Sequence, residues 1–178
     1  MSGFDRCVPE IPSTRDAVAA EMRHLELSGG WPHHVVAELA AIARVVDHPS
    51  GTVLFREGEP AVGIHIVAGG QVALEMSVPA RGAVRLLTVG RGELLGWSGV
   101  VGWAQSTATA RTLAPTRLIS FAAVDVAELC ERNHEVGYRL MQRLAWAVAK
   151  RLTATRLQLL DLYSHEAPMI PPVPGAKV

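Results

Sequence analysis

The residues of this 178-residue chain that could do nucleophilic, redox or metal chemistry are scattered along it. Cys7 and Cys130 lie outside any CxxC spacing and are too few for a zinc or iron–sulfur site. His65 lies in an alternating Gly-Ile-His-Ile run, but a strand metal site needs a His-x-His pair, and residue 67 is Val. The sequence has no Gly-x-Ser-x-Gly elbow and no Gly-Lys-Ser/Thr phosphate loop. These observations predict a protein that is not an enzyme and holds no metal or other cofactor.

The overall charge argues against a protein that binds nucleic acid through its whole surface. The chain has 17 Lys+Arg and 17 Asp+Glu residues and a pI near 7.1, whereas release of counterions from nucleic acid needs clustered excess positive charge. Any basic patch must therefore be local. The N-terminus has no apolar signal region, and no stretch approaches the ~18 apolar residues of a membrane span. We expect a cytoplasmic protein that does not contact the membrane.

The elements that must position any site change in type along the chain. Residues 1–12 and the proline-rich residues 164–178 lack periodicity, so we expect mobile tails around a single domain, 13–163. The domain begins with capping-box-like residues that predict a helix over 13–27. Helical spacing of apolar residues predicts a second helix over 32–46. His33, His34 and His134 have no carboxylate or thiol at ligand spacing and are expected on the surface.

After residue 49 the pattern changes to short strands separated by glycine-containing turns. Alternating runs predict strands over 52–55, 63–67, 71–77, 83–89, 107–113 and 117–121. Many short strands at even spacing are typical of an antiparallel β-roll, jelly roll or sandwich and not of a parallel sheet. With helices expected over 122–133 and 135–163, the fold class is α+β.

The last predicted helix is unusually long and carries one narrow apolar stripe. Its members recur near helical spacing over about seven turns. The stripe could contact the β-roll of the same chain, but a stripe this long exceeds the width of a small roll. We therefore expect a coiled-coil homodimer. The stripe comprises Met141, Leu144, Val148, Leu152, Thr155, Leu159 and Leu162, together with Gly137.

Three motifs in sequence order resemble the cyclic-nucleotide-binding domain of the catabolite-activator and Fnr (Crp/Fnr) regulator superfamily. They are Gly51-Thr-Val-Leu-Phe-Arg-Glu-Gly-Glu-Pro60, Ile66-Val-Ala-Gly-Gly-Gln-Val-Ala-Leu74 and Val89-Gly-Arg-Gly-Glu-Leu-Leu-Gly96. The resemblance covers about residues 27–163. It implies a double-stranded β-helix with N-terminal helices and a long C-terminal dimerisation helix, acting as a regulatory domain.

The resemblance is weaker at the phosphate-binding cassette. In members that bind cyclic nucleotides, a Glu accepts a hydrogen bond from the ribose and an Arg holds the cyclic phosphate. In the matching frame Trp97 occupies the Glu position, Ser106 the Arg position and Thr107 the small-residue position after it. Glu93 belongs to the preceding strand, and Arg111 falls on the opposite strand face. Each lost contact to phosphate costs ~2–5 kcal/mol, so ordinary cyclic-nucleotide binding is disfavoured.

The remaining pocket residues are mostly small and uncharged, which suits a neutral or apolar effector. Thr155 matches the position from which some members reach the adenine base, and its neighbour Arg156 departs from their small polar residue. Two alternatives remain: Trp97 could fill the roll and leave a structural adaptor with an occluded pocket, or an altered cassette could still sense cyclic AMP. The candidate effector-binding residues are Gly96, Trp97, Ser98, Ser106, Thr107, Thr155 and Arg156.

DNA binding is disfavoured, because only about fifteen residues follow Tyr163, too few for the helix-turn-helix domain of most relatives. The long helix is nevertheless basic, and Arg139, Arg143 and Lys150 fall opposite the apolar stripe. They form either a solvated helix surface or a docking surface for an acidic partner. We therefore expect a stand-alone, non-enzymatic regulatory or sensor module that acts as a homodimer through a small-molecule effector or an unknown protein partner.

Overall fold

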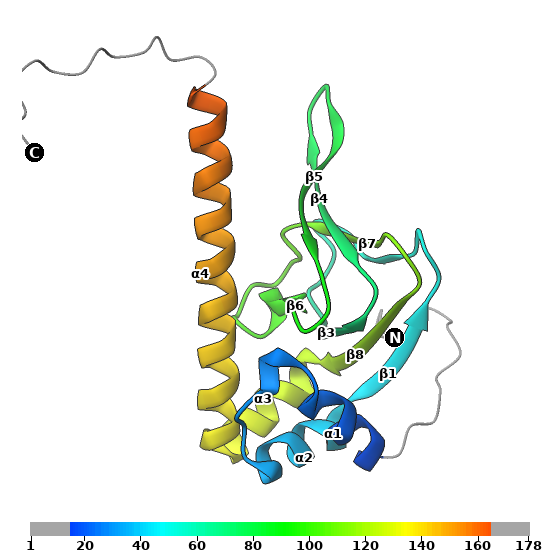
Figure 1. The fold of residues 1–178 in the computed structure, drawn as a ribbon, viewed down its shortest axis with the longest axis vertical. Coiled ribbons are helices and arrows are strands. Elements are labelled where there is room, and N and C mark those ends of the chain that lie inside the picture. The colour runs from blue at the N-terminus through cyan, green and yellow to red at the C-terminus, as the bar shows by residue number, and fades with distance from the viewer. Residues whose placement is uncertain (1–14, 165–178) are drawn as a thin grey trace, which may run out of the picture. The chain divides into compact units, whose positions relative to one another are not determined.

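The computed structural model describes residues 15–164 (Figure 1). The chain divides into one unit that ends at Leu144 and another that begins at Ala145. The predicted tails lie almost wholly outside the described residues, so the domain boundaries stay predictions. The helices are α1 (Arg15–Arg23), the 3₁₀ helix η1 (Glu26–Ser28), α2 (His33–Ile42), the 3₁₀ helix η2 (Trp97–Gly99), α3 (Ala123–Arg132) and α4 (His134–Ser164).

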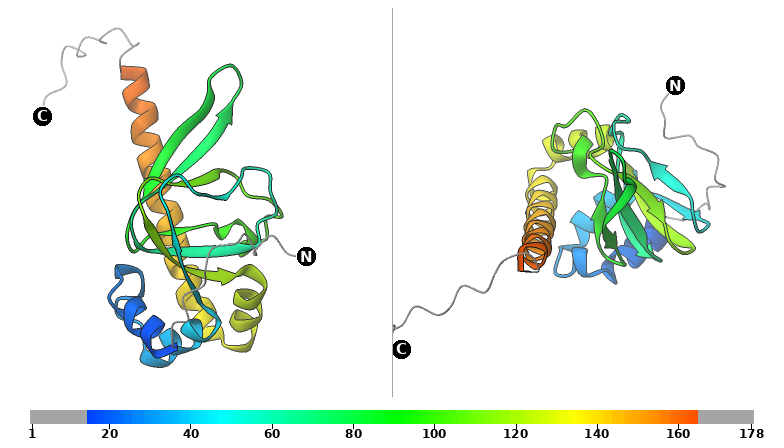
Figure 2. Two further views of the ribbon diagram at one scale, coloured as in Figure 1. Left: turned by 90° about the vertical axis from the view of Figure 1, so that its right-hand side faces the viewer. Right: turned by 90° about the horizontal axis from the view of Figure 1, so that it is seen from above.

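Eight antiparallel strands form two four-stranded sheets, which confirms the predicted β-roll. The first sheet has the order β1-β8-β3-β6, from β1 (Arg44–His48), β8 (Thr116–Ala122), β3 (Gly63–Gly69) and β6 (Leu94–Leu95). The second has the order β2-β7-β4-β5, from β2 (Val53–Phe55), β7 (Thr109–Thr112), β4 (Val72–Val78) and β5 (Gly82–Val89). The β4–β5 hairpin projects from the roll (Figure 2).

One strand was predicted as helix. The expected helix over 32–46 ends at Ile42, and the chain turns extended at Ala43 to begin β1. Val45 is buried and lies opposite Ile119 of β8 in the antiparallel ladder. The β-branched pair Val45-Val46 is as compatible with a strand as with a helix, and pairing with β8, some seventy residues away, decides between them.

Two separate apolar cores stabilise the first unit. The smaller lies within the roll and includes Val67, Leu95 and Leu118. The larger lies between the other face of the first sheet and helices α1, α2 and α3, which gather at one end of the roll (Figures 1 and 2). Side chains alternate between the two cores along β3 and β8, because successive strand residues point to opposite faces.

The first turns of α4 belong to the larger core. The predicted stripe is therefore buried at Leu144 and exposed further along the helix. Leu144 is only 3% exposed and packs in this core with Val136 and Leu140. Gly137 also faces its own chain, because a Cβ at that position would contact Cys130 of α3. The assignment of Leu144 to an intermolecular interface is therefore corrected: it packs within its own subunit. The other stripe members with described side chains are exposed, namely Met141, Val148, Leu152, Thr155 and Leu159.

Candidate functional site

The cassette segment forms a tight turn and one turn of 3₁₀ helix seated on the start of β3. Gly96 adopts φ +78°, a left-handed conformation, and a Cβ there would lie 2.7 Å from the carbonyl oxygen of Gly63. A Cβ at Gly99 would overlap the backbone of Ala61 and meet the side chain of Ala123, at the start of α3. The two glycines allow η2 to lie directly against the sheet.

Backbone hydrogen bonds hold the segment that follows η2. The Trp103 amide donates to the Ser98 carbonyl at 2.9 Å. The amide of Ser106 donates to the carbonyl of Glu59 at 2.8 Å, and the Ser106 carbonyl accepts from the amide of Gly58 at 2.9 Å. This two-bond pairing fixes Ser106 against the turn between β2 and β3.

The two positions that the sequence frame assigns to the cassette anchors, Trp97 and Ser106, carry neither a carboxylate nor a guanidinium. Trp97 is partly buried and packs against the larger, helix-side core. Ser98 and Ser106 are buried, whereas Thr107 is exposed. The segment therefore offers hydroxyl and backbone groups, and the loss of the ribose and phosphate anchors stays a prediction of the sequence comparison.

The two nearby charged residues have partners elsewhere. Arg111 donates to a Glu75 carboxylate oxygen at 3.3 Å and to the Gly51 carbonyl at 3.4 Å. Its strand neighbours on either side are buried, so Arg111 points to the outer face of its sheet. Glu93 accepts a hydrogen bond at 2.8 Å from the amide of Gly90 within its own turn.

Thr155 and Arg156 lie in the second unit and are exposed there. The Thr155 hydroxyl donates to the Arg151 carbonyl of the preceding turn at 3.0 Å, a local bond that Thr commonly makes in helices. Their place at the effector site stays a prediction.

His65 lies next to Gly96 of the cassette and is a partly buried residue of β3, as expected once a metal site was disfavoured. Its ring stacks on Phe55 with centroids 6.1 Å apart, and Nδ1 is 2.8 Å from the Ser120 hydroxyl. Burial, and then the nearby charge of His48, lowers the pKa of His65 from 6.5 to about 4. His65 is therefore a neutral hydrogen-bonding residue at neutral pH. Within residues 15–164 no three His, Cys, Asp or Glu side chains form a potential metal-binding group.

We expect acid to destabilise the fold through His65. Its folded-state pKa of about 4 lies below the unfolded value of 6.5, so its contribution is fully present above pH 6.5 and is lost as pH falls towards 4. Between pH 8 and pH 5 the loss is about 2 kcal/mol. Urea unfolding at the two pH values should show this loss in the wild type and in exposed-site control His33→Gln. It should be much smaller in His65→Gln, and an equal loss in all three proteins would contradict the assignment.

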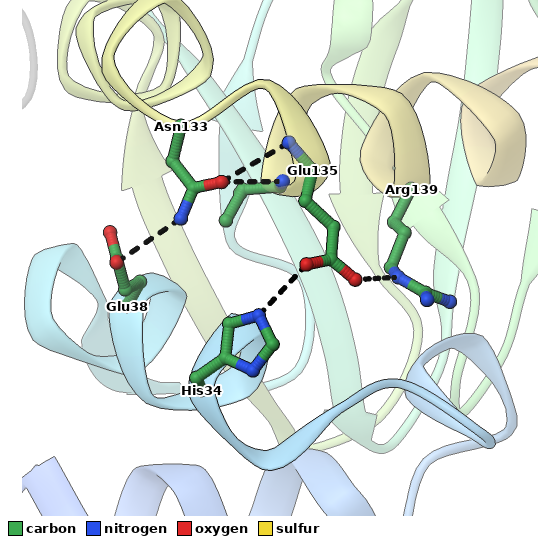
Figure 3. Close-up of polar contacts among 6 residues, drawn as sticks. His34, Glu38, Asn133, Glu135 and Arg139 are labelled. Carbon is green, nitrogen blue, oxygen red and sulfur yellow. Dashed lines mark hydrogen bonds and ion pairs between the residues drawn. The ribbon is translucent and has the colours of Figure 1, made fainter.

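A polar cluster joins α2 to the start of α4 (Figure 3). The Asn133 side-chain oxygen accepts hydrogen bonds from the amides of Glu135 and Val136, which caps α4, and its Nδ2 donates to Glu38 at 3.2 Å. Glu135 contacts His34 at 2.9 Å and Arg139 at 3.1 Å. The hydrogen bond from His34, and then that from Arg139, lowers the pKa of the Glu135 carboxyl. His34 thus has a carboxylate partner 101 residues away, which local spacing could not indicate.

The three predicted docking residues differ in their surroundings. Arg139 pairs with Glu135, and Arg143 donates to the Gly29 carbonyl at 2.9 Å, so both are engaged within the first unit. Lys150 lies in the second unit, 5.4 Å from the centre of the Trp146 ring. The docking surface composed of Arg139, Arg143 and Lys150 therefore stays a prediction, with two of its members already engaged in contacts within the chain.

Comparison with known proteins identifies relatives of this fold. The chain is 28% identical over 134 residues to the CRP-like cAMP-activated global transcriptional regulator of Mycobacterium tuberculosis, covering 75% of this chain and 58% of that protein. A cyclic nucleotide-binding domain from Methylobacillus flagellatus matches with a TM-score of 0.71 at 18% identity, covering 83% of each chain. The N-terminal domain of a transcriptional regulator from Streptomyces coelicolor matches with a TM-score of 0.61 at 27% identity, covering 75% of this chain and 93% of that one.

The chain spans between 30% and 58% of the length of the curated relatives it matches. Within residues 15–164 no helix combines the length and the apolar character needed to cross a bilayer. Residues 45–133, half of the chain, match the family described as the cyclic nucleotide-binding domain. Family match, roll topology and ordered motifs agree: the chain belongs to the cyclic nucleotide-binding domain family and is related to the Crp/Fnr regulators.

Proposed function

We propose that this domain is a non-enzymatic regulatory module whose altered cassette responds to an uncharged effector and not to an ordinary cyclic nucleotide. The observation that carries the proposal is the cassette itself, where Trp97 packs into the helix-side core and Ser106 is held by backbone bonds to the β2–β3 turn. A cyclic phosphate would enter this site without a paired guanidinium, and burial of an unpaired charge is costly.

Contacts inside the first unit connect η2 of the cassette to α3 and to the start of α4, so a change at the cassette can reach α4. Gly99 of η2 lies so near the start of α3 that a Cβ on it would be 3.1 Å from the Ala123 side chain, and the Ala123 amide donates to the Val62 carbonyl at 2.9 Å. At the other end of α3, Cys130 lies against Gly137 of α4. An effector that displaces η2 would therefore shift α3 and, through it, the first turns of α4.

Cyclic AMP should leave the thermal stability of the wild-type domain unchanged at millimolar concentration. A ligand at 100 times its Kd stabilises a protein by about 2.7 kcal/mol, which a melting experiment detects easily. The matched variant Ser106→Arg returns a guanidinium to the cassette, and we expect cyclic AMP to raise its melting temperature. A saturable rise for the wild type at micromolar cyclic AMP would instead establish a nucleotide sensor with an altered cassette.

We further propose that the domain is a homodimer through the exposed part of the predicted stripe. Val148 and Leu152 are 45% and 49% exposed, a large apolar area for a helix in water. The double variant Val148→Gln/Leu152→Gln should shift sedimentation from dimer to monomer with unchanged helix content. An unchanged mass of the double variant would contradict the dimer. So would a wild type that is already monomeric at about 100 µM, a concentration at which a dimer with a micromolar Kd is mostly associated.

A further inference from the structure

A second apolar stripe lies on the part of α4 that follows Leu144. Trp146, Leu157 and Leu160 are 53%, 62% and 65% exposed. At about 100° per residue they fall roughly opposite Val148, Leu152 and Leu159 around the helix. A helix that is apolar on two opposite faces can pair on both, so a dimer formed through one stripe would leave the other uncovered.

The spacing of the second stripe is that of a coiled-coil seam. Trp146, Lys150, Thr153, Leu157 and Leu160 are separated by four, three, four and three residues, the alternation of heptad positions a and d. Thr153 turns its hydroxyl to the Ala149 carbonyl at 3.0 Å, so its polar group is satisfied within the helix. Lys150 is thus the charged member of an otherwise uncharged seam.

The charge of the helix indicates what covers this seam. From Val136 to Leu160, α4 carries Arg139, Arg143, Lys150, Arg151 and Arg156 and no Asp or Glu. A second copy paired in register on this stripe would bring the two Lys150 side chains together inside the seam, which disfavours self-association there. The stripe that contains Val148 and Leu152 has no charged member. A partner with carboxylates at the corresponding positions would be attracted.

We propose that the seam formed by Trp146, Lys150, Thr153, Leu157 and Leu160 docks an acidic amphipathic helix of another protein. Apolar residues of that helix pack between Trp146 and Leu157, and one of its carboxylates pairs with Lys150 beside the indole ring. Arg156, on the flank of the seam, attracts further acidic residues. A lipid surface fits less well, because only three apolar side chains are spread along four turns with a lysine between them.

The test uses the full chain and two synthetic four-heptad peptides with leucine at the seam positions. One carries Glu at every flanking position and opposite Lys150, and the other carries Lys at the same positions. Titration followed by fluorescence anisotropy of labelled peptide should show at least tenfold tighter binding of the acidic peptide. Equal affinities, or no binding of the acidic peptide at 100 µM, would overturn the proposal.

Matched variants distinguish the two faces of α4. Leu157→Gln/Leu160→Gln should weaken the acidic peptide at least tenfold, whereas Val148→Gln/Leu152→Gln on the opposite face should leave its affinity within twofold. Lys150→Glu should move the preference towards the basic peptide. All of these positions are exposed, and circular dichroism checks that each variant keeps its helix content. Assembly beyond the dimer that depends on Leu157 and Leu160, or binding to anionic lipid vesicles in preference to the acidic peptide, would contradict a protein-helix partner.

Discussion

Replacing Leu144 by alanine should lower the free energy of unfolding by about 3 kcal/mol, the middle of the range for a buried leucine. Leu144 is 3% exposed and packs with Val136 and Leu140 in the core between the first sheet and the helices. The substitution removes three buried carbon atoms and leaves a cavity that the surrounding sheet and helices can fill only in part. Urea unfolding at a single low protein concentration measures the loss.

The matched control lies two turns further along the same helix. Leu152 is 49% exposed, and its replacement by alanine should change the stability of the subunit by less than about 1 kcal/mol. Its effect should grow with protein concentration if the stripe associates, whereas the effect of Leu144→Ala should not. If both substitutions lowered the free energy of unfolding equally, or if the effect of Leu144→Ala vanished on dilution, Leu144 would have to lie in the intermolecular interface.

The contrast between these two leucines shows what helical periodicity can and cannot predict. The apolar spacing of the last helix correctly indicated a long helix, because that spacing follows from 3.6 residues per turn, but it indicated only one of the two apolar stripes. It could not indicate where the helix leaves its own core, since buried and exposed leucines have the same spacing. The tertiary contacts of Val136, Leu140 and Leu144 decide that.

The β-roll was predictable for a different reason. Glycines at turns, such as Gly70 with φ +85° between β3 and β4, mark the strand boundaries in the sequence itself. Strand β1 has no such boundary before it, and only its ladder with β8 distinguishes it from a continuation of α2. Local turn chemistry therefore predicted six strands, and long-range pairing determined the other two strands of residues 15–164, β1 with β8 and the short β6 with β3.

At the candidate site, sequence reasoning located the cassette but not the direction of its side chains. The motif placed Gly96, Trp97, Ser98 and Ser106 on one segment; the structure places the first three in and beside η2, and pairs Ser106 with the turn between β2 and β3. Whether Trp97 packs within the roll or against the helices depends on the φ of Gly96 and on the packing of η2. Likewise, the contact of His65 with Ser120 requires the β3–β8 ladder, which no local pattern encodes.

Gly99→Ala should destabilise the domain by about 3 kcal/mol or more, because a Cβ at this position overlaps the backbone of Ala61. The added carbon would lie 3.0 Å from the Ala61 carbonyl carbon and 3.1 Å from the Ala123 side chain. The Ala61 backbone, just before β3, and the Cβ of Ala123, at the start of α3, cannot rotate away from the added carbon. The 3₁₀ helix η2 must therefore move off the sheet. Overpacking of this kind costs about 1–3 kcal/mol even where side chains can adjust.

Gly69→Ala is the matched control, because nothing lies within 4 Å of a Cβ at that position and its φ is not in the left-handed region. Its melting temperature should stay close to that of the wild type, while that of Gly99→Ala should fall by roughly 6 °C or more, as a loss of about 3 kcal/mol implies for a domain of this size. Near-native stability of Gly99→Ala would mean that η2 does not lie against Ala61 and Ala123. The contact route from the cassette through α3 to α4 would then lose its first step, and with it the proposed means by which an effector acts.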